Sequence, residues 1–182
     1  MKKILLLHVL LAISILPFAQ TSTAPSAEQV MKEATEEAAK TGRKVFIMFH
    51  ASWCGWCHKM DRAMNDPSCS QFFKDNFVVR HLVVDEAKDK KHLENPGAEE
   101  MKIKYHGAGQ GIPYWLVFDD RGNLLADSKS RKEGEGPEKG ENTGCPATEP
   151  EVNYFISMLK ENTKLTADQL EIIRKRFRQN EQ

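Results

Sequence analysis

Apolar and polar positions follow a helical period at first and then a strand pattern. Ser26-Ala27-Glu28-Gln29 has the form of a capping box, and the amphipathic stretch after it predicts a helix to about Lys40 that Gly42 ends. Residues 44–51 (KVFIMFHA) are apolar and rich in β-branched and aromatic side chains, which predicts a buried strand. A helical pattern returns from Cys54 to about Asn65, before Asp66-Pro67 stops it.

The next hundred residues add further strands and one helix. Residues 77–85 (FVVRHLVVD) predict a central strand, and residues 98–105 predict a helix within a stretch rich in lysine and glutamate. Residues 113–118 (PYWLVF) predict a strand that opens with proline, and residues 119–123 (DDRGN) predict the turn of a hairpin. The order of these elements predicts an α/β protein with a central mixed β-sheet flanked by helices.

The last third of the chain changes in composition. Residues 129–150 are rich in Lys, Glu, Gly and Pro, which predicts a flexible insertion before the C-terminal helices. Thr148-Glu149-Pro150-Glu151 and Thr166-Ala167-Asp168-Gln169 predict the starts of two closing helices. We therefore expect one domain over residues 26–182 that includes the insertion and these helices.

The motif with the clearest chemistry is Trp53-Cys54-Gly55-Trp56-Cys57-His58. As a string it fits a redox C-x-x-C pair, half of a zinc site, or the C-x-x-C-H of covalent haem attachment. Its position between a strand and a helix favours redox chemistry, because a thiol at a helix N-terminus has a pKa below the free value of about 8.5. Cys57, one helical turn later, lies close enough to attack a mixed disulfide formed at Cys54.

A second segment, Gly111-Ile112-Pro113, opens the later strand and is suited to a cis X-Pro bond. With both motifs, residues 43 to 128 resemble the thioredoxin family, whose cis-proline loop faces the redox pair. The nearest pattern is similar to the C-terminal periplasmic domain of the reductant carrier DsbD and its small exported relatives. The resemblance implies a thioredoxin-like fold and disulfide exchange with proteins.

The resemblance also implies a role for individual positions. Cys54 would be the attacking thiol, Cys57 the resolving thiol, and Pro113 the residue that orients the incoming chain. Trp53, Trp56 and Ile112 would form a shallow groove for an extended client peptide. Two positions depart from the family pattern: Met48 stands where thioredoxins carry a buried aspartate, and His81 stands where they often place a lysine.

The first residues predict export. Lys2 and Lys3 precede an apolar stretch too short to span a bilayer, which predicts a signal peptide over residues 1–20 with cleavage between about 19 and 24. No cysteine follows that stretch before Cys54, so we expect no lipid anchor and a periplasmic or secreted protein. In an oxidising compartment the remaining cysteines, Cys69 and Cys145, are candidates for a structural disulfide or for two free thiols.

Other uses of the cysteine pair remain open from the sequence. Haem attachment would leave Gly111-Ile112-Pro113 unexplained, and a copper or zinc site built from Cys54, Cys57 and His50 or His58 lacks a second cysteine pair. A structural disulfide, or a redox-insensitive client-binding protein, would use the same fold. We expect no metal and no cofactor besides the redox disulfide.

Charge and the residues between the cysteines bear on the partners. The 26 basic and 26 acidic residues balance, so net charge recruits neither nucleic acid nor an anionic membrane. Gly55-Trp56 places no charge between the cysteines, which favours a reductase or isomerase over an oxidase. The expected partners are protein thiols and disulfides and an upstream redox partner, and we expect a monomer without stable membrane insertion.

Overall fold

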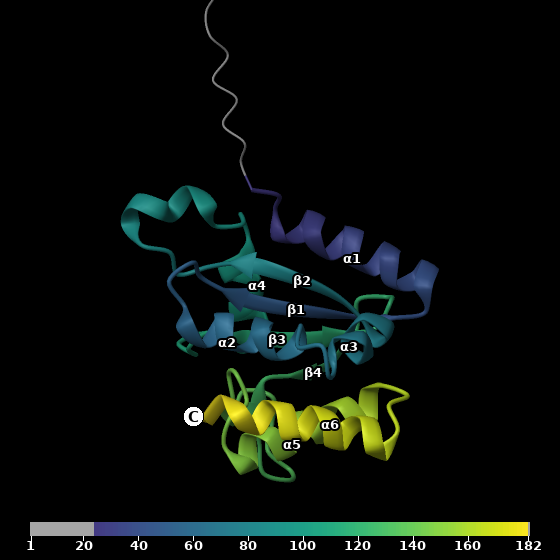
Figure 1. Cartoon of the computed structure of the whole chain (residues 1–182). Helices are drawn as coiled ribbons and strands as arrows, with labels where there is room; N and C mark the ends of the chain where they lie inside the picture. The colour runs from purple at the N-terminus through teal and green to yellow at the C-terminus, as the bar shows by residue number, and fades with distance from the viewer. Residues whose placement is uncertain (1–23, 182) are drawn as a thin grey trace, which may run out of the picture.

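The computed structural model describes residues 24–181, and the signal peptide predicted over residues 1–20 lies outside them (Figure 1). Its helices are α1 Ala27–Thr41, α2 Gly55–Met64, α3 Ser70–Asn76, α4 Ala98–Lys104, α5 Glu149–Asn162, α6 Ala167–Arg178 and the 3₁₀ segments η1 Lys88–Leu93 and η2 Gln179–Glu181. Its strands are β1 Lys44–His50, β2 Phe77–Val83, β3 Tyr114–Phe118, β4 Leu124–Asp127, β5 Lys129–Ser130 and β6 Glu141–Asn142. Among residues 24–181, none of the helices is both long and apolar enough to cross a membrane.

The main sheet has four strands in the order β2-β1-β3-β4. Strands β1 and β2 are parallel, whereas β3 is antiparallel to β1 and to β4, so the sheet is mixed as predicted. The prediction of a central strand at 77–85 is wrong, because β2 lies at the edge of the sheet. Helices cover both faces of β2, so the strand carries apolar side chains on both faces. The sequence of this edge strand therefore has the apolar run that is typical of a central strand.

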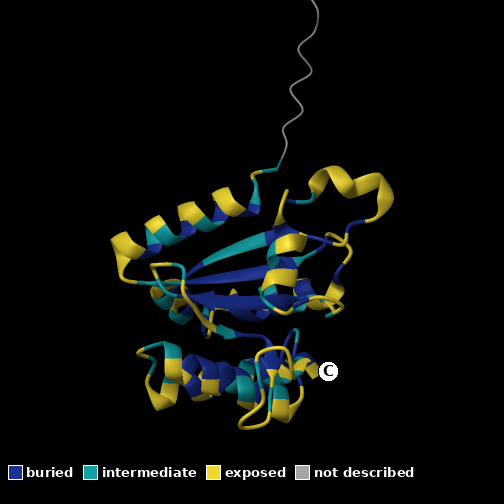
Figure 2. Cartoon of the chain, turned by 180° about the vertical axis from the view of Figure 1, so that it is seen from behind, coloured by how far each residue is buried: buried dark blue, intermediate teal, exposed yellow. Residues whose placement is uncertain are grey.

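Two hydrophobic clusters pack against opposite faces of the sheet, and Figure 1 shows helices on both of these faces. In β1 the side chains of Val45, Ile47 and Phe49 point towards α1 and α4, and those of Phe46 and Met48 point towards α2, α3, α5 and α6. This alternation follows the two-residue period of a strand. Figure 2 shows the result, with buried strands between helices whose outer faces are exposed.

Local helix signals are confirmed where the sequence predicted them. The Ser26 side chain accepts a hydrogen bond from the Gln29 N–H at 3.1 Å, and Gly42 ends α1 with a φ of 68°. Thr148 and Thr166 each form a reciprocal capping box at the starts of α5 and α6. These short-range contacts depend on neighbouring residues only, so they are visible in the sequence.

The insertion at 129–150 has more structure than its composition predicts. Strands β5 and β6 form a small antiparallel sheet. The buried Lys129 ammonium donates to the carbonyls of Pro137 at 3.3 Å and Glu138 at 2.8 Å, which ties the intervening turn back onto the strand. Asn142 of β6 connects this small sheet to the loop that precedes β3, because its amide donates to the Gly111 and Pro113 carbonyls.

Candidate active site

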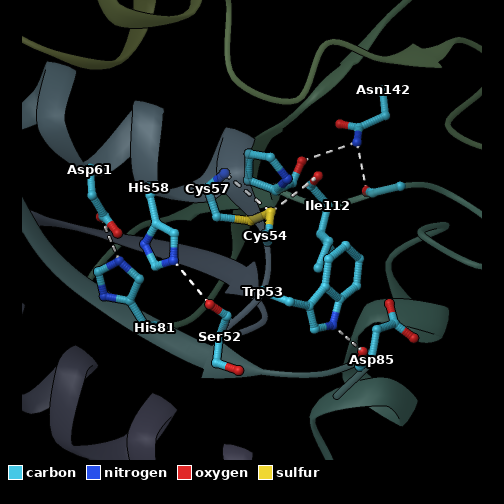
Figure 3. The surroundings of a disulfide bond; sticks show 12 residues. Ser52, Trp53, Cys54, Cys57, His58, Asp61, His81, Asp85, Ile112 and Asn142 are labelled. Carbon is cyan, nitrogen blue, oxygen red and sulfur yellow. Dashed lines mark hydrogen bonds and ion pairs between the residues drawn. A yellow bond between two sulfur atoms is a disulfide. The ribbon is translucent and has the colours of Figure 1, made fainter. Parts of the chain in front are cut away.

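Cys54 and Cys57 are joined in a disulfide at the start of α2, with their Cα atoms 5.3 Å apart (Figure 3). Cys54 is the N-cap residue, and its sulfur accepts a hydrogen bond from the Cys57 N–H at 3.1 Å. A helix N-terminus carries free N–H groups and a partial positive charge, so it stabilises negative charge on a sulfur at the cap. The predicted position of Cys54 at the start of the helix is confirmed.

The loop before β3 faces the disulfide. The Ile112 carbonyl oxygen lies 3.6 Å from the Cys54 sulfur, and the Ile112 side chain packs against a small buried cluster of Ala51, Cys54 and Cys57. The Ile112–Pro113 peptide bond is cis. The two sequence motifs, some 58 residues apart, therefore meet at one site.

The two tryptophans of the motif have different surroundings. Trp53 is 60% exposed, and its indole N–H donates to the Asp85 carbonyl at 2.8 Å. Trp56 is 49% exposed and lines a groove together with Ile112 and Pro113. The structure thus brings two of the three predicted client-binding residues into one groove, and Trp53 is not among the residues that line it.

A buried carboxylate fixes the loop that precedes Cys54. Glu86 accepts hydrogen bonds from the Ser52 N–H at 2.5 Å and the Ser52 hydroxyl at 2.8 Å. Burial raises the pKa of Glu86, but the two bonds from Ser52 and the charge of Lys90 outweigh it, so the pKa lies below its usual value. The His58 ring adds a contact of 3.0 Å to the Ser52 carbonyl, which connects the same loop to α2.

Met48 and His81 are the two positions at which the sequence departs from the pattern of the family it resembles. Met48 is fully buried and pairs with Trp115 of β3, and it offers no proton acceptor because its thioether is not a base. The His81 Nε2 atom lies 2.8 Å from the carboxylate of Asp61 in α2, and the His81 ring lies edge-on to the His50 ring at 4.9 Å. Burial, together with the nearby His81, lowers the pKa of His50, whose Nδ1 atom has no hydrogen-bond partner among the described residues.

Asn142 in the insertion is a site residue that the sequence did not indicate. Its amide donates to the Gly111 carbonyl at 2.7 Å and to the Pro113 carbonyl at 3.0 Å (Figure 3). Its backbone N–H donates to the side chain of Gln110 at 3.2 Å. Asn142 therefore holds the insertion against the cis-proline loop, a contact between distant segments with no local signature.

The disulfide considered between Cys69 and Cys145 is not formed, and both residues are buried free thiols. Cys69 lies before α3, where its sulfur contacts the Ala63 carbonyl at 3.2 Å. The sulfur of Cys145 instead accepts a hydrogen bond from the Asn180 amide at 3.4 Å. Burial raises the pKa of both thiols, that of Cys145 to about 12.

The described residues offer no cluster suited to a metal. Within 24–181, no group of three or more His, Cys, Asp or Glu side chains is arranged to hold an ion. Both sulfurs of the motif are used in the disulfide, and the His58 ring is engaged with the Ser52 carbonyl. In this state neither sulfur is available as a metal ligand or for attachment of haem.

Several solved structures are similar to this chain. A disulphide isomerase from Xylella fastidiosa Temecula1 is 22% identical with a TM-score of 0.46, over 63% of this chain and 80% of that one. The oxidoreductase DsbH is 18% identical with a TM-score of 0.40, over 82% and 94%. A thioredoxin from Thermus thermophilus is 17% identical with a TM-score of 0.45, over 75% and 84%.

No curated protein matches the chain. The profile of the thioredoxin-like family matches residues 26–120, which is more than half of the sequence. That range runs from the cap of α1 through β3 and includes both cysteines of the disulfide and the cis-proline. The chain belongs to the thioredoxin-like family.

Proposed function

We propose that this protein is an exported thiol-disulfide oxidoreductase that exchanges disulfides with protein substrates through Cys54 and Cys57. The observation that carries the proposal is the position of Cys54 as N-cap of α2, with the Cys57 N–H on its sulfur. This arrangement stabilises a thiolate, and the thiolate is the nucleophile in disulfide exchange. Family membership supports the same chemistry.

The exchange proceeds in two balanced steps from the reduced protein. The Cys54 thiolate attacks a client disulfide, one client sulfur leaves as a thiolate, and a mixed disulfide forms. The Cys57 sulfur, after loss of its proton to solvent or a nearby base, then attacks Cys54, and the second client sulfur leaves. The client gains two electrons, the Cys54–Cys57 disulfide forms, and a dithiol donor must reduce it again.

The direction of electron flow that we propose is reductive. The residues between the cysteines, Gly55 and Trp56, supply no charge that would further stabilise the Cys54 thiolate, so the dithiol is a good electron donor. Export rests on the signal peptide predicted over residues 1–20. In the periplasm such a protein would act as a reductase or isomerase of protein disulfides, supplied by an upstream redox partner.

The proposal is tested with cysteine variants of the purified mature chain. Cys54→Ser should abolish reduction of insulin by dithiothreitol above the uncatalysed rate, because the attacking sulfur is lost. Cys57→Ser should trap client proteins as mixed disulfides, which non-reducing gels and mass spectrometry detect. Cys69→Ala is the matched control, because it removes a buried thiol outside the site and should retain insulin turnover.

Two results would contradict the two-cysteine mechanism. One is full multiple turnover by Cys57→Ser without any trapped species. The other is wild-type activity of Cys54→Ser. A protein that binds unfolded clients equally well as wild type and as the double Cys54→Ser, Cys57→Ser variant, and that catalyses no exchange, would be a client-binding protein with a structural disulfide.

A further inference from the structure

The groove beside the disulfide is built jointly by the thioredoxin-like core and the insertion. It measures about 580 Å³, within the range of sites that bind small ligands or a few residues of a peptide. Trp56, Ile112 and Pro113 line one side, and residues 141–145 of the insertion line the other. The bonds from Asn142 to the Gly111 and Pro113 carbonyls hold the two sides together.

The charged residues that line this groove all have the same sign. They are Glu141, Glu151 and Glu181, and no lysine or arginine is among the described residues that line it. Glu181 forms an ion pair with Arg178 at 2.6 Å, and Glu151 accepts the N–H groups of Ala147 and Thr148. Lys59 of α2 lies with its Nζ atom 4.7 Å from the centroid of the Trp56 ring and donates a hydrogen bond to the Asn180 carbonyl.

Glu141 is the carboxylate most available to a bound molecule. It is exposed, and its side chain makes no hydrogen bond or ion pair with any residue of the described chain. It directly precedes Asn142, so the bonds of Asn142 to the cis-proline loop hold it at the groove that Ile112 and Pro113 also line. A positive side chain of a bound peptide would therefore meet a negative charge that no cation among residues 24–181 already neutralises.

We propose that the acidic side of this groove selects clients with lysine or arginine close in sequence to the reacting cysteine. This inference rests on the proposed function and specifies its substrate class. The apolar side, with Trp56 and Ile112, would bind the peptide irrespective of its charge, and Glu141 with Glu151 would discriminate between clients. A protein with little net charge thus gains specificity from the charge of a few carboxylates at the groove.

The test compares three peptides of equal length that carry one fluorophore-releasing disulfide flanked by Lys, Ser or Glu pairs. At low salt, kcat/KM should be highest for the Lys peptide, about three- to fivefold above the Ser peptide, which is the size of an exposed ion pair. The Glu peptide should be slower than the Ser peptide. The ratio of kcat/KM for the Lys peptide to that for the Ser peptide should approach one at 0.5 M salt, because the screening length is then on the order of 4 Å.

Glu141→Gln should lower the ratio of Lys to Ser peptide towards one. Glu133→Gln is the matched control, because it removes one exposed carboxylate from the same insertion outside the groove and should leave the ratio as in wild type. Equal kcat/KM for all three peptides would overturn the inference and leave the proposed function intact. An unchanged ratio in Glu141→Gln would overturn it as well.

Binding separates this inference from the exchange chemistry. The double Cys54→Ser, Cys57→Ser variant cannot exchange disulfides, so titration of its tryptophan fluorescence with reduced peptides measures the groove alone. Tighter binding of the Lys peptide than of the Glu peptide supports the inference, even if the wild-type protein turns over no peptide. Absence of turnover would refute the proposed function and leave the inference about binding intact. Equal binding of the Lys and Glu peptides overturns the inference.

Discussion

Reduction of the Cys54–Cys57 disulfide should lower the free energy of unfolding by about 1 kcal/mol, a balance of two opposing effects. The disulfide closes a loop of four residues, and in the chain-entropy account such a loop destabilises the unfolded state by about 2 kcal/mol. Reduction removes this contribution. It also leaves a Cys54 thiolate that accepts the Cys57 N–H, and a charged acceptor strengthens a hydrogen bond by about 1 kcal/mol.

This difference in stability is linked to the direction of electron flow. If the folded protein favours the disulfide by about 1 kcal/mol relative to the unfolded chain, its reduction potential lies about 20 mV lower than that of the unfolded cysteine pair. A fold that favours its disulfide gives up electrons readily from the dithiol. The predicted sign is therefore that of a reductant.

The assay is urea denaturation at pH 7 with and without excess dithiothreitol, followed by tryptophan fluorescence and circular dichroism. Trp115 is fully buried, so its emission reports loss of the core. With a urea slope of about 2 kcal/mol per molar, the midpoint should fall by about 0.5 M on reduction. The double Cys54→Ser, Cys57→Ser variant should show one midpoint under both conditions, because Cys69 and Cys145 are already free thiols.

The reasoning would be refuted if the free energy of unfolding of the reduced protein exceeded that of the oxidised protein by about 1 kcal/mol or more. It would mean that the fold stabilises the dithiol more than loop closure favours the disulfide. The protein would then be an oxidant, and the argument from the uncharged Gly55-Trp56 pair would be wrong.

Three further predictions follow from individual contacts. Because burial raises the pKa of Cys145 to about 12, the oxidised native protein should react slowly with a thiol reagent at pH 8, and unfolding in guanidinium should expose two reactive thiols. Asn142→Ala should lower the free energy of unfolding by about 1–2 kcal/mol in urea titrations, because it removes the hydrogen bonds from the side-chain amide to the Gly111 and Pro113 carbonyls. An unchanged urea midpoint would mean that water replaces those hydrogen bonds at no cost. The pKa of His50 is lowered by burial and by His81, so the unfolded chain takes up a proton first as the pH falls below about 6.5, and the free energy of unfolding should decrease there. His50→Asn should flatten this pH dependence. An equal slope in the variant would exclude His50 as the source of the dependence.

Features that depend on neighbouring residues could be predicted from the sequence. The cap at Ser26, the glycine stop at Gly42 and the capping boxes at Thr148 and Thr166 are all present where the sequence places them. The position of Cys54 at a helix start follows in the same way from a strand, a short turn and a helical pattern. Each of these features is fixed within a few residues of chain.

Several features that depend on long-range packing could not be predicted. The sequence of β2 does not show that β1 is its one partner among the described strands, because an apolar pattern reports burial of the two faces of a strand and not pairing at its edges. The state of Cys69 and Cys145 depends on where two distant segments lie, and each sulfur contacts a different neighbour. Asn142 and Glu86 act on the site across the fold, and a single asparagine or glutamate in a polar segment gives no signal of such a role.

The most direct test of disulfide exchange is a redox titration of the mature chain in glutathione and dithiothreitol buffers, followed by tryptophan fluorescence with a visible absorption spectrum. The account predicts a reversible two-electron transition, no haem band, and a midpoint at or below about −200 mV, in the range of glutaredoxins and thioredoxin. A pair that shows no reversible transition, or a haem spectrum, would contradict the exchange mechanism. A midpoint near about −120 mV would contradict the reductive direction.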